Sequence, residues 1–368
     1  MYQEIIFGLL LFFAAIQLFY HVYYFLAIAF NKETFDIKIH RPVSVIVCAH
    51  NELENLQKLI PAILQQNYHL FELIVINDRS FDGTYEYLEE LKKTESKLKV
   101  VTADENRSNM DAKKYALTLG IKAASHEHLL LTDADCIPNN KNWILQMQSK
   151  FTENIEFVLG ISQYEKGKGF LNAIIRAETF YTAIQYISFA IRKNTYMGIG
   201  RNIAYKKSVF LENKGFHPFM YITGGDDDLF VNKQANKYNC TVSVSFDSQT
   251  TSLPKLTWKE WITQKKRHLS VSRYYSSKSK FELIMLNFSH LGVSFSVILL
   301  AFSELYYNFG LLIFLARWLI LILTYNIAIK KMRYNIAIWQ LLVFDFIYPF
   351  YYIFVGLQSL RNKNIKWK

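Results

Sequence analysis

Two aspartates, one residue apart, follow directly on an apolar run. The segment Leu129 to Cys136 reads LLLTDADC, so Asp133 and Asp135 stand where a buried strand is expected to end. In open α/β sheets, ligands bind outside the carboxyl ends of the strands. Two carboxylates at that edge can share a hard divalent cation with a diphosphate. The pair therefore indicates a nucleotide-sugar site, with an ordinary solvated turn as the alternative, because Asp is also common in turns.

A repeated pattern of strand and helix surrounds these aspartates. Apolar runs beginning at Arg41, Phe71 and Lys97 read as strands, and each is followed by helical spacing of apolar residues: Leu53 to Gln66, Tyr85 to Lys93 and Asp111 to Ala124. This alternation predicts right-handed crossovers and a mostly parallel sheet. The polar residues that end the strands should then meet at one edge: His50, Asn51, Glu52, Asp78, Asp133 and Asp135.

A second acidic centre lies in GGDDDLF, Gly224 to Phe230. Three adjacent carboxylates repel one another, which should raise at least one pKa and favour a general base near neutrality. The alternative is an acidic surface loop with no role in binding or catalysis. Its position after the glycine-rich segment GIGRNIAY, Gly198 to Tyr205, favours a functional site.

The order of these segments resembles a known family. AHNE, INDRSFDGT, DAKKYAL, TDAD, GIGRNIAY, GGDDDLF and QKKRH follow one another as in the family 2 inverting glycosyltransferases, from about Pro42 to Tyr275. That group includes cellulose and hyaluronan synthases and many bacterial envelope enzymes. The resemblance implies an α/β domain with the nucleotide-diphospho-sugar transferase fold (GT-A), in which helices flank a mostly parallel sheet.

The resemblance also implies roles for the matching residues on the donor side. His50 would pack on the base, Asp78 would bond the base or ribose, and Lys113 would meet the diphosphate, although Ala112 replaces the usual Gly before it. The implied nucleotide-sugar contacts are His50, Asn51, Glu52, Asp78, Lys113, Asp133, Gln264 and Arg267. Asp135, helped by Asp133, is implied as the ligand of Mg²⁺ or Mn²⁺.

On the acceptor side, alignment with the family puts the catalytic base on Asp226. Gly225 stands where the family has Glu, so Asp227 is a credible substitute. Inversion needs one base that takes the proton of the acceptor hydroxyl as it attacks. Asn202 and His268 are the expected acceptor contacts. His268 stands where the family has Trp, and this counts against a long-chain polymerase.

The composition also predicts membrane-spanning segments, since 51% of the 368 residues are hydrophobic. The stretch from Ile5 to Phe30 has no charged residue, and at about 1.5 Å rise per residue it can span a bilayer. Three further candidates are Leu283 to Ala301, Leu305 to Ile329 and Ile336 to Leu357. Arg317 and Asp345 lie inside the last two, where an ionisable group should face protein, headgroups or an acceptor cavity.

We therefore expect five parts of the chain: an N-terminal anchor (1–31), a GT-A domain (42–250), an interfacial basic and aromatic segment (251–281), C-terminal transmembrane helices (282–358) and a basic tail (359–368). Lys32, Lys38 and Arg41 follow the first span, so the catalytic domain should face the cytoplasm at the inner membrane. A fourth full span would place the basic tail outside, against the charge rule. Either the rule fails here or the last segment, interrupted by Asp345 and Pro349, is re-entrant.

The net charge of +11 has two readings, nucleic-acid binding or an anionic bilayer surface. Lys and Arg are frequent from Lys255 to Lys280, with Trp258 and Trp261 among them, directly before an apolar span. This is the interfacial pattern, and it disfavours nucleic acid. The three cysteines have no metal-ligand spacing and indicate buried thiols of a reduced compartment.

The expected partners are a nucleotide-sugar donor, a membrane, and a lipid or lipid-linked acceptor. The sequence leaves open a processive polysaccharide synthase and, in another class, a non-catalytic membrane assembly protein that retains the fold. The presence of both Asp135 and Asp226 favours an enzyme.

Overall fold

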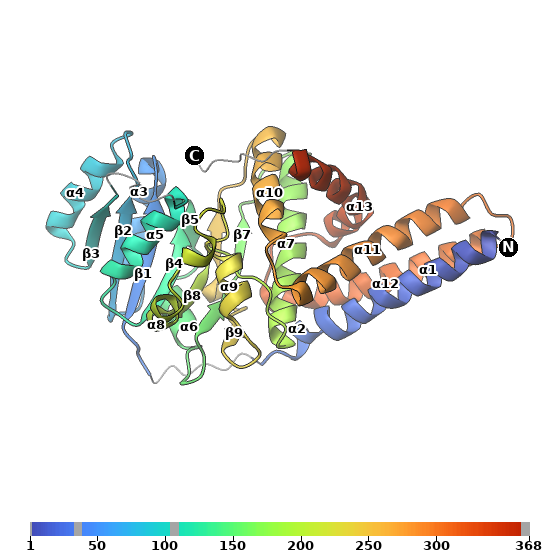
Figure 1. The fold of residues 1–368 in the computed structure, drawn as a ribbon, viewed down its shortest axis with the longest axis horizontal. Coiled ribbons are helices and arrows are strands. Elements are labelled where there is room, and N and C mark those ends of the chain that lie inside the picture. Colours follow the sequence, from blue (N-terminus) through green and yellow to red (C-terminus); the bar gives the residue numbers. More distant parts are fainter. Residues whose placement is uncertain (1, 33–38, 104–109, 362–368) are drawn as a thin grey trace.

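The computed structural model describes residues 2–32, 39–103 and 110–361. Its centre is a seven-stranded sheet in the order β3-β2-β1-β4-β8-β6-β9 (Figure 1). The strands in that order are β3 (Leu98–Thr102), β2 (Phe71–Asn77), β1 (Val43–Ala49), β4 (His128–Asp133), β8 (Ile203–Lys206), β6 (Phe157–Leu159) and β9 (Cys240–Val242). The first four are parallel, and only β8 runs antiparallel to its neighbours. The predicted mostly parallel α/β sheet is confirmed.

Helices cover both faces of this sheet, which explains why its central strands are apolar without alternation. All seven residues of β1, VSVIVCA, are buried. Val45 and Val47 pack with α3 (Leu53–Leu64) and α6 (Trp143–Gln148), whereas Ile46 and Cys48 pack with α5 (Ala112–Ala123) and α7 (Phe170–Ile191). α4 (Thr84–Thr94) joins β2 to β3. The predicted helices are found within a few residues of their expected ends.

A three-stranded sheet continues from the aspartate strand. It consists of β5 (Cys136–Pro138), β10 (Thr250–Ser252) and β7 (Ser162–Tyr164), with β10 in the middle. The remaining elements of the domain are α8 (Lys207–Glu212), two short 3-10 turns (His217–Phe219 and Phe246–Ser248), α9 (Asp228–Gln234) and α10 (Trp258–Ser272). Since β10 pairs with β5 and then leads into α10, the chain returns to the aspartate edge before α10 begins.

Three long apolar helices form a bundle that projects from the domain (Figure 1). They are α1 (Tyr2–Phe19), extended by a π-helical turn (Tyr20–Phe25) and α2 (Ala27–Phe30), α11 (Ser277–Leu300) and α12 (Tyr307–Met332). α13 (Ile338–Arg361) lies instead beside α7 and α10, next to the domain. Within the described residues, all four predicted segments are helices long and apolar enough to cross a membrane.

α7 joins the two halves of the molecule. It is buried along most of its length, packing on β7 and β9 on one side and on α2 and α13 on the other. The bundle is therefore built into the same core as the sheet. Lys38 and residues 362–368 of the predicted tail lie outside the described residues.

Candidate active site

The carboxyl ends of β2, β1 and β4 meet side by side. Cys48 is opposite Ile76 on one side and Asp133 on the other, so the residues that follow these strands share one edge. The backbone carbonyl of Asp78 accepts a hydrogen bond from Nδ1 of His50 at 2.5 Å. The predicted gathering of polar residues at this edge is confirmed in geometry.

Tight turns fix the first part of this edge. Asn51 and Arg79 have left-handed backbones, with φ of 57° and 54°. The Asn51 side chain accepts from the N–H of Phe81, which ties the turn after β1 to the turn after β2. Asp78 is buried, and its Oδ1 accepts from Nε of Arg79 at 2.7 Å. Its Oδ2 has no partner among the described residues, so it can accept a donor from a ligand.

Glu52 and Asp135 lie close enough to influence each other. Burial and the Asp135 carboxylate raise the pKa of Glu52, although a hydrogen bond from Asn55 opposes this. Burial and the neighbouring Asp133 likewise raise the pKa of Asp135. Carboxylates that crowd one another in this way hold excess negative charge, which a cation would relieve.

The ligand atoms of Asp133, Asp135 and Cys136 all lie within 4.8 Å of one another. Carboxylate oxygens suit Mg²⁺ and Mn²⁺, so this group of side chains fits the predicted divalent cation. Cys136 was not among the predicted ligands, because its thiol was interpreted as an ordinary buried cysteine. Its position directly after the Asp-x-Asp was the available signal.

Lys113 connects the two acidic centres. It stands in the first turn of α5, and the N-cap residue Asp111 accepts from the N–H of Lys114 there. The Lys113 ammonium lies 2.9 Å from Oδ1 of Asp133 and 3.1 Å from Oδ2 of Asp226. Burial alone would lower the pKa of Lys113, but these carboxylates raise it well above its usual value. The side chain therefore stays cationic.

A cavity opens around this lysine. Its lining brings together the aspartate strand, the GIGRNIAY segment and the second acidic centre: Cys48, Lys113, Leu117, Leu131, Thr132, Asp133, Gly200, Ile203, Asp226 and Asp227. A Cβ on Gly200 would stand 3.3 Å from Asp227 and 3.6 Å from the Lys113 ammonium. Glycine at this position therefore keeps the cavity open.

The three consecutive aspartates have three different environments. Burial raises the pKa of Asp226, yet the Lys113 ammonium outweighs burial and lowers it below the usual value. Burial and the Asp226 charge raise the pKa of Asp227 to about 6. Burial and Asp227 raise that of Asp228 well above its usual range, and Asp228 accepts from the Tyr275 hydroxyl at 2.7 Å. The rise in pKa at Asp227 and Asp228 thus comes first from burial, and the repulsion between neighbouring carboxylates adds to it.

The turn before these aspartates explains why Gly replaces the family's Glu. Gly224 and Gly225 have φ of +79° and +82°, a left-handed conformation that side chains other than Gly rarely adopt. A Cβ on Gly225 would also approach Leu229 within 2.7 Å. A glutamate at this position would be strained, which leaves Asp226 and Asp227 as the carboxylates of this turn that face the cavity.

Helix α10 places the Gln264 to His268 segment near this cavity. The stem of Arg267 passes 3.7 Å from the Cβ position of Gly224, beside the acidic turn. Gln264 donates to the Tyr164 hydroxyl at 3.1 Å, and its Oε1 is buried without a partner among the described residues. His268 is exposed on α10.

Two sequence-based interpretations are corrected here. Trp261, interpreted as an interfacial residue, is fully buried and packs edge-on against Tyr164, because α10 turns this side into the domain. Asn202, predicted to contact the acceptor, is also fully buried. It donates to the carbonyls of Ile161 and Ser248 and accepts from Trp143, so its polar atoms are committed to the core. Trp258 remains partly exposed.

Arg201 is a candidate that sequence reasoning did not single out. Its guanidinium lies 4.4 Å from the centre of the Tyr164 ring, and its Nη1 has no partner among the described residues. Burial would lower the pKa of Arg201, but Tyr164, Cys136 and Asp135 raise it. The residue lies in the GIGRNIAY motif, where an arginine directly before Asn202 is the available signal.

Comparison with known proteins agrees with this arrangement. The model of the family "Glycosyl transferase family 2" matches residues 44–213. An uncharacterized glycosyltransferase of Haemophilus influenzae is 30% identical over 174 residues, which are 42% of this chain and 52% of that protein. A poly-beta-1,6-N-acetyl-D-glucosamine synthase of Staphylococcus epidermidis is 37% identical over 95 residues, or 26% of this chain and 22% of that protein. The chain thus spans about half, or less, of the length of these relatives.

The solved structure of the mannosyltransferase PcManGT from Pyrobaculum calidifontis, in complex with GDP-Man and Mn²⁺, is similar over the whole chain. The TM-score is 0.66 at 18% identity, and the match covers 99% of this chain and 100% of that one. At this identity the likeness shows the fold, a GT-A-like α/β domain with apolar helices. Residues 44–213, a little under half of the chain, thus match glycosyl transferase family 2, and the fold agrees with that match.

Proposed function

We propose that the protein is a membrane-bound inverting glycosyltransferase that moves a sugar from a nucleotide diphospho-sugar, with a UDP-sugar as the leading candidate, to a lipid or lipid-linked acceptor. The observation that carries this proposal is the cavity in which Lys113 lies between Asp133 and Asp226. It joins a carboxylate pair suited to a cation and diphosphate with a second carboxylate suited to a base.

Donor binding would use the edge formed by β2, β1 and β4. The free Oδ2 of Asp78 can accept an N–H or hydroxyl of the nucleoside, and the His50 ring is held at the same turn by the Asp78 backbone carbonyl. Lys113 supplies a point charge for the diphosphate, and Arg267 adds a second cation from α10. Arg201 is a third positive group, close to Asp135.

Asp135 and Asp133 would hold a divalent cation, with Cys136 adjacent. Such a cation neutralises charge on the departing diphosphate. The mannosyltransferase of Pyrobaculum calidifontis was solved with Mn²⁺, which supports this assignment.

Asp226 is the proposed base, with Asp227 as the alternative. Both line the cavity, and inversion requires a single base to remove the proton of the attacking hydroxyl. No covalent intermediate is needed. Arg267 would stabilise the negative charge that develops on the leaving diphosphate.

The membrane is proposed from the four apolar helices, with the domain on the cytoplasmic side of the inner membrane. α13 lies beside α7 and α10 and does not extend along the bundle, which supports the re-entrant alternative for the last segment. His268, exposed on α10, would border the acceptor.

A processive polysaccharide synthase is the second candidate function. It is supported by the similarity to a poly-beta-1,6-N-acetyl-D-glucosamine synthase.

The test is transfer by purified protein in vesicles that contain extracted membrane lipids, supplied in turn with UDP- and GDP-sugars. Mass spectrometry of the lipids should show one added hexose or N-acetylhexosamine with one donor. A ladder of additions would favour the synthase.

Two variants complete this experiment. Asp226→Asn should give no product, whereas Glu153→Gln, which changes an exposed carboxylate on the loop before β6, should match the wild type. If no donor labels any lipid or glycan while each variant is folded, the non-catalytic assembly protein becomes the better account.

A further inference from the structure

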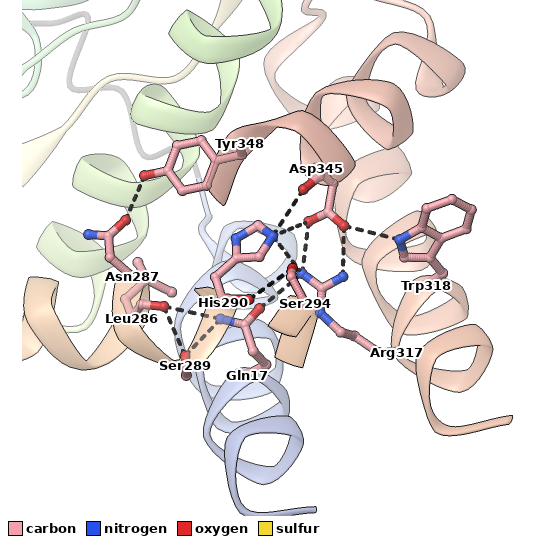
Figure 2. A network of polar contacts seen from close by, with 10 residues as sticks. All are labelled: Gln17, Leu286, Asn287, Ser289, His290, Ser294, Arg317, Trp318, Asp345 and Tyr348. Carbon is pink, nitrogen blue, oxygen red and sulfur yellow. Dashed lines mark hydrogen bonds and ion pairs between the residues drawn. The ribbon is translucent and has the colours of Figure 1, made fainter. Parts of the chain in front are cut away.

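A buried network of polar side chains links all four apolar helices (Figure 2). At its centre, the Arg317 guanidinium of α12 binds both oxygens of Asp345 of α13, at 2.7 and 2.8 Å. His290 of α11 lies 3.1 Å from Oδ1 of Asp345. Gln17 of α1 accepts from Arg317 at 3.2 Å and donates to Ser289 of α11 at 2.8 Å.

Asp345 is saturated by these contacts. Besides Arg317 and His290, the Trp318 indole donates to its Oδ2 at 3.0 Å, and only 5% of the residue is exposed. A carboxylate with this many donors has no capacity left for a substrate. The network therefore binds no ligand through Asp345, and its role is to hold α13 in position.

Stability alone does not account for an ion pair at this place. Removing two charges from water costs several kcal/mol per ion. Apolar residues at these positions can therefore stabilise the helix packing as much as a buried ion pair does. A bidentate Arg–carboxylate contact does fix one geometry, because both N–H···O bonds form only in one relative position. The pair thus sets where α13 sits on the bundle.

The same face of α13 continues from the network to the active-site helix. Asp345, Tyr348 and Tyr351 are three residues apart and so share one side of the helix. Tyr348 donates to Asn287 of α11 at 2.6 Å and packs edge-on against Tyr181 of α7 at 4.8 Å. Tyr351 neighbours Trp261 of α10.

Trp261 lies one helical turn before Gln264 and Lys265. Lys265 is paired with Glu178 of α7 at 2.5 Å, so α10 is held between α7 and α13. A shift of α13 would therefore shift the segment from Gln264 to His268 relative to the cavity.

We propose that Asp345 is a positioning residue: by fixing α13 to the membrane helices, it holds α10, with Gln264 and Arg267, in place beside the catalytic carboxylates. This rests on the proposed function in assigning those two residues to the donor. The chemistry of the site thus depends on a buried ion pair that touches no substrate.

The test uses the full chain in lipid nanodiscs and four proteins: wild type, Asp345→Asn, the double variant Arg317→Met/Asp345→Leu, and Phe346→Leu as the matched control. Phe346 adjoins Asp345 but is 58% exposed on the apolar surface. Hydrogen exchange is followed in α10 (Trp258–Ser272) and, as reference, in α4 (Thr84–Thr94). Transfer kinetics are measured on the same samples.

In Asp345→Asn we expect amide exchange in α10 to rise about tenfold while α4 stays unchanged. kcat should fall at least about tenfold with donor KM within about threefold, because Arg267 acts mainly on charge that develops in the transition state. The double variant, which keeps apolar packing but lacks the bidentate contact, should keep α10 exchange raised and kcat low while α4 stays unchanged, because apolar packing alone does not fix one position of α13. Phe346→Leu should behave as the wild type.

Three results would overturn the proposal. They are unchanged α10 exchange in Asp345→Asn, an equal rise in α10 and α4, and a double variant that regains both protection and kcat without the ion pair. If the wild type itself transfers no sugar, the proposed function fails. The exchange data still decide whether Asp345 positions α10.

Discussion

At the scale of single residues, neighbouring carboxylates in this site acquire different chemistry from their surroundings. Lys113 keeps Asp226 ionised, whereas Asp227 lacks so close a cation and has its pKa raised to about 6. Asp228 is tied to Tyr275 and belongs to the packing of α9. Two of the three adjacent aspartates are therefore candidates for the base, and they differ in a measurable way.

We predict that Asp226→Asn lowers kcat by about 10²- to 10⁴-fold, the usual contribution of a general base, and leaves nucleotide affinity nearly intact. The base acts on the acceptor, so nucleotide binding does not need it. Single-turnover transfer and UDP titration measure the two effects. If Asp226→Asn stays active and Asp227→Asn is dead, the role belongs to Asp227.

The pH dependence of kcat/KM separates the same two residues. A base must be deprotonated, and the pKa of Asp226 is lowered, so activity should stay flat as pH falls from about 7.5 to about 5.5 if Asp226 is the base. If Asp227 is the base, its pKa of about 6 halves the active fraction near pH 6. The measurement is the transfer rate at a donor concentration below its KM, taken at several pH values between about 7.5 and about 5.5.

We also predict that nucleotide binding depends on a divalent cation held by Asp135. A diphosphate close to Asp133 and Asp135 is repelled unless a cation lies between them. Calorimetry with UDP should show affinity with Mn²⁺ that is lost with a chelator, and Asp135→Ala should bind weakly in both conditions. Glu153→Gln serves as the control. Equal affinity with Mn²⁺ and with chelator would contradict the prediction.

At the scale of elements, the turn before α9 sets the direction of the acidic centre. Gly225 has a φ of +82°, and a Cβ there would press on Leu229. We predict that Gly225→Ala destabilises the protein by ~1–3 kcal/mol through backbone strain. Thermal unfolding in detergent should show a lower midpoint. Gly8→Ala, in a helix with no atom within 4 Å of the new Cβ, should not lower it.

Sequence reasoning located the strands and their shared edge because parallel strands bring their carboxyl ends together whatever the details of packing. His50, Asp78 and Asp133 follow from that rule alone. The bridge from Lys113 to Asp226 joins residues far apart in the chain and depends on how α5 and α9 pack, so no local pattern contains it. Asn202 and Trp261 were misassigned for the same reason: a motif gives residue type and order, but burial decides the role.

At the scale of the whole molecule, the proposed acceptor is expected to approach between the domain and the apolar helices. α10 carries the Gln264 to His268 segment and is followed after a few residues by α11, so the cavity and the membrane helices are close along the chain. A lipid-borne hydroxyl would reach such a site by lateral diffusion. We predict transfer to acceptors with a hydrophobic tail, bound between α10 and the C-terminal helices.

The test compares transfer rates of the purified protein on two kinds of acceptor. One is a lipid acceptor in vesicles, and the other is a water-soluble sugar with the same headgroup. Lipid acceptors should react at least about tenfold faster at equal bulk concentration. Comparable rates on both would argue against the prediction. So would full activity on the lipid in a chain that ends near Lys280.

The arrangement of the bundle has a consequence for how the protein is made. α1 is synthesised first, yet Gln17 finds its partners in Leu286 and Ser289 of α11, 269 and 272 residues later. At about 5–20 residues per second, ribosomes need roughly 10–50 s to reach them. In a bilayer, the Gln17 amide would spend that interval without its native hydrogen bonds. We therefore expect the nascent first helix to need an insertase or a membrane chaperone until the last quarter of the chain, which contains α11, is made.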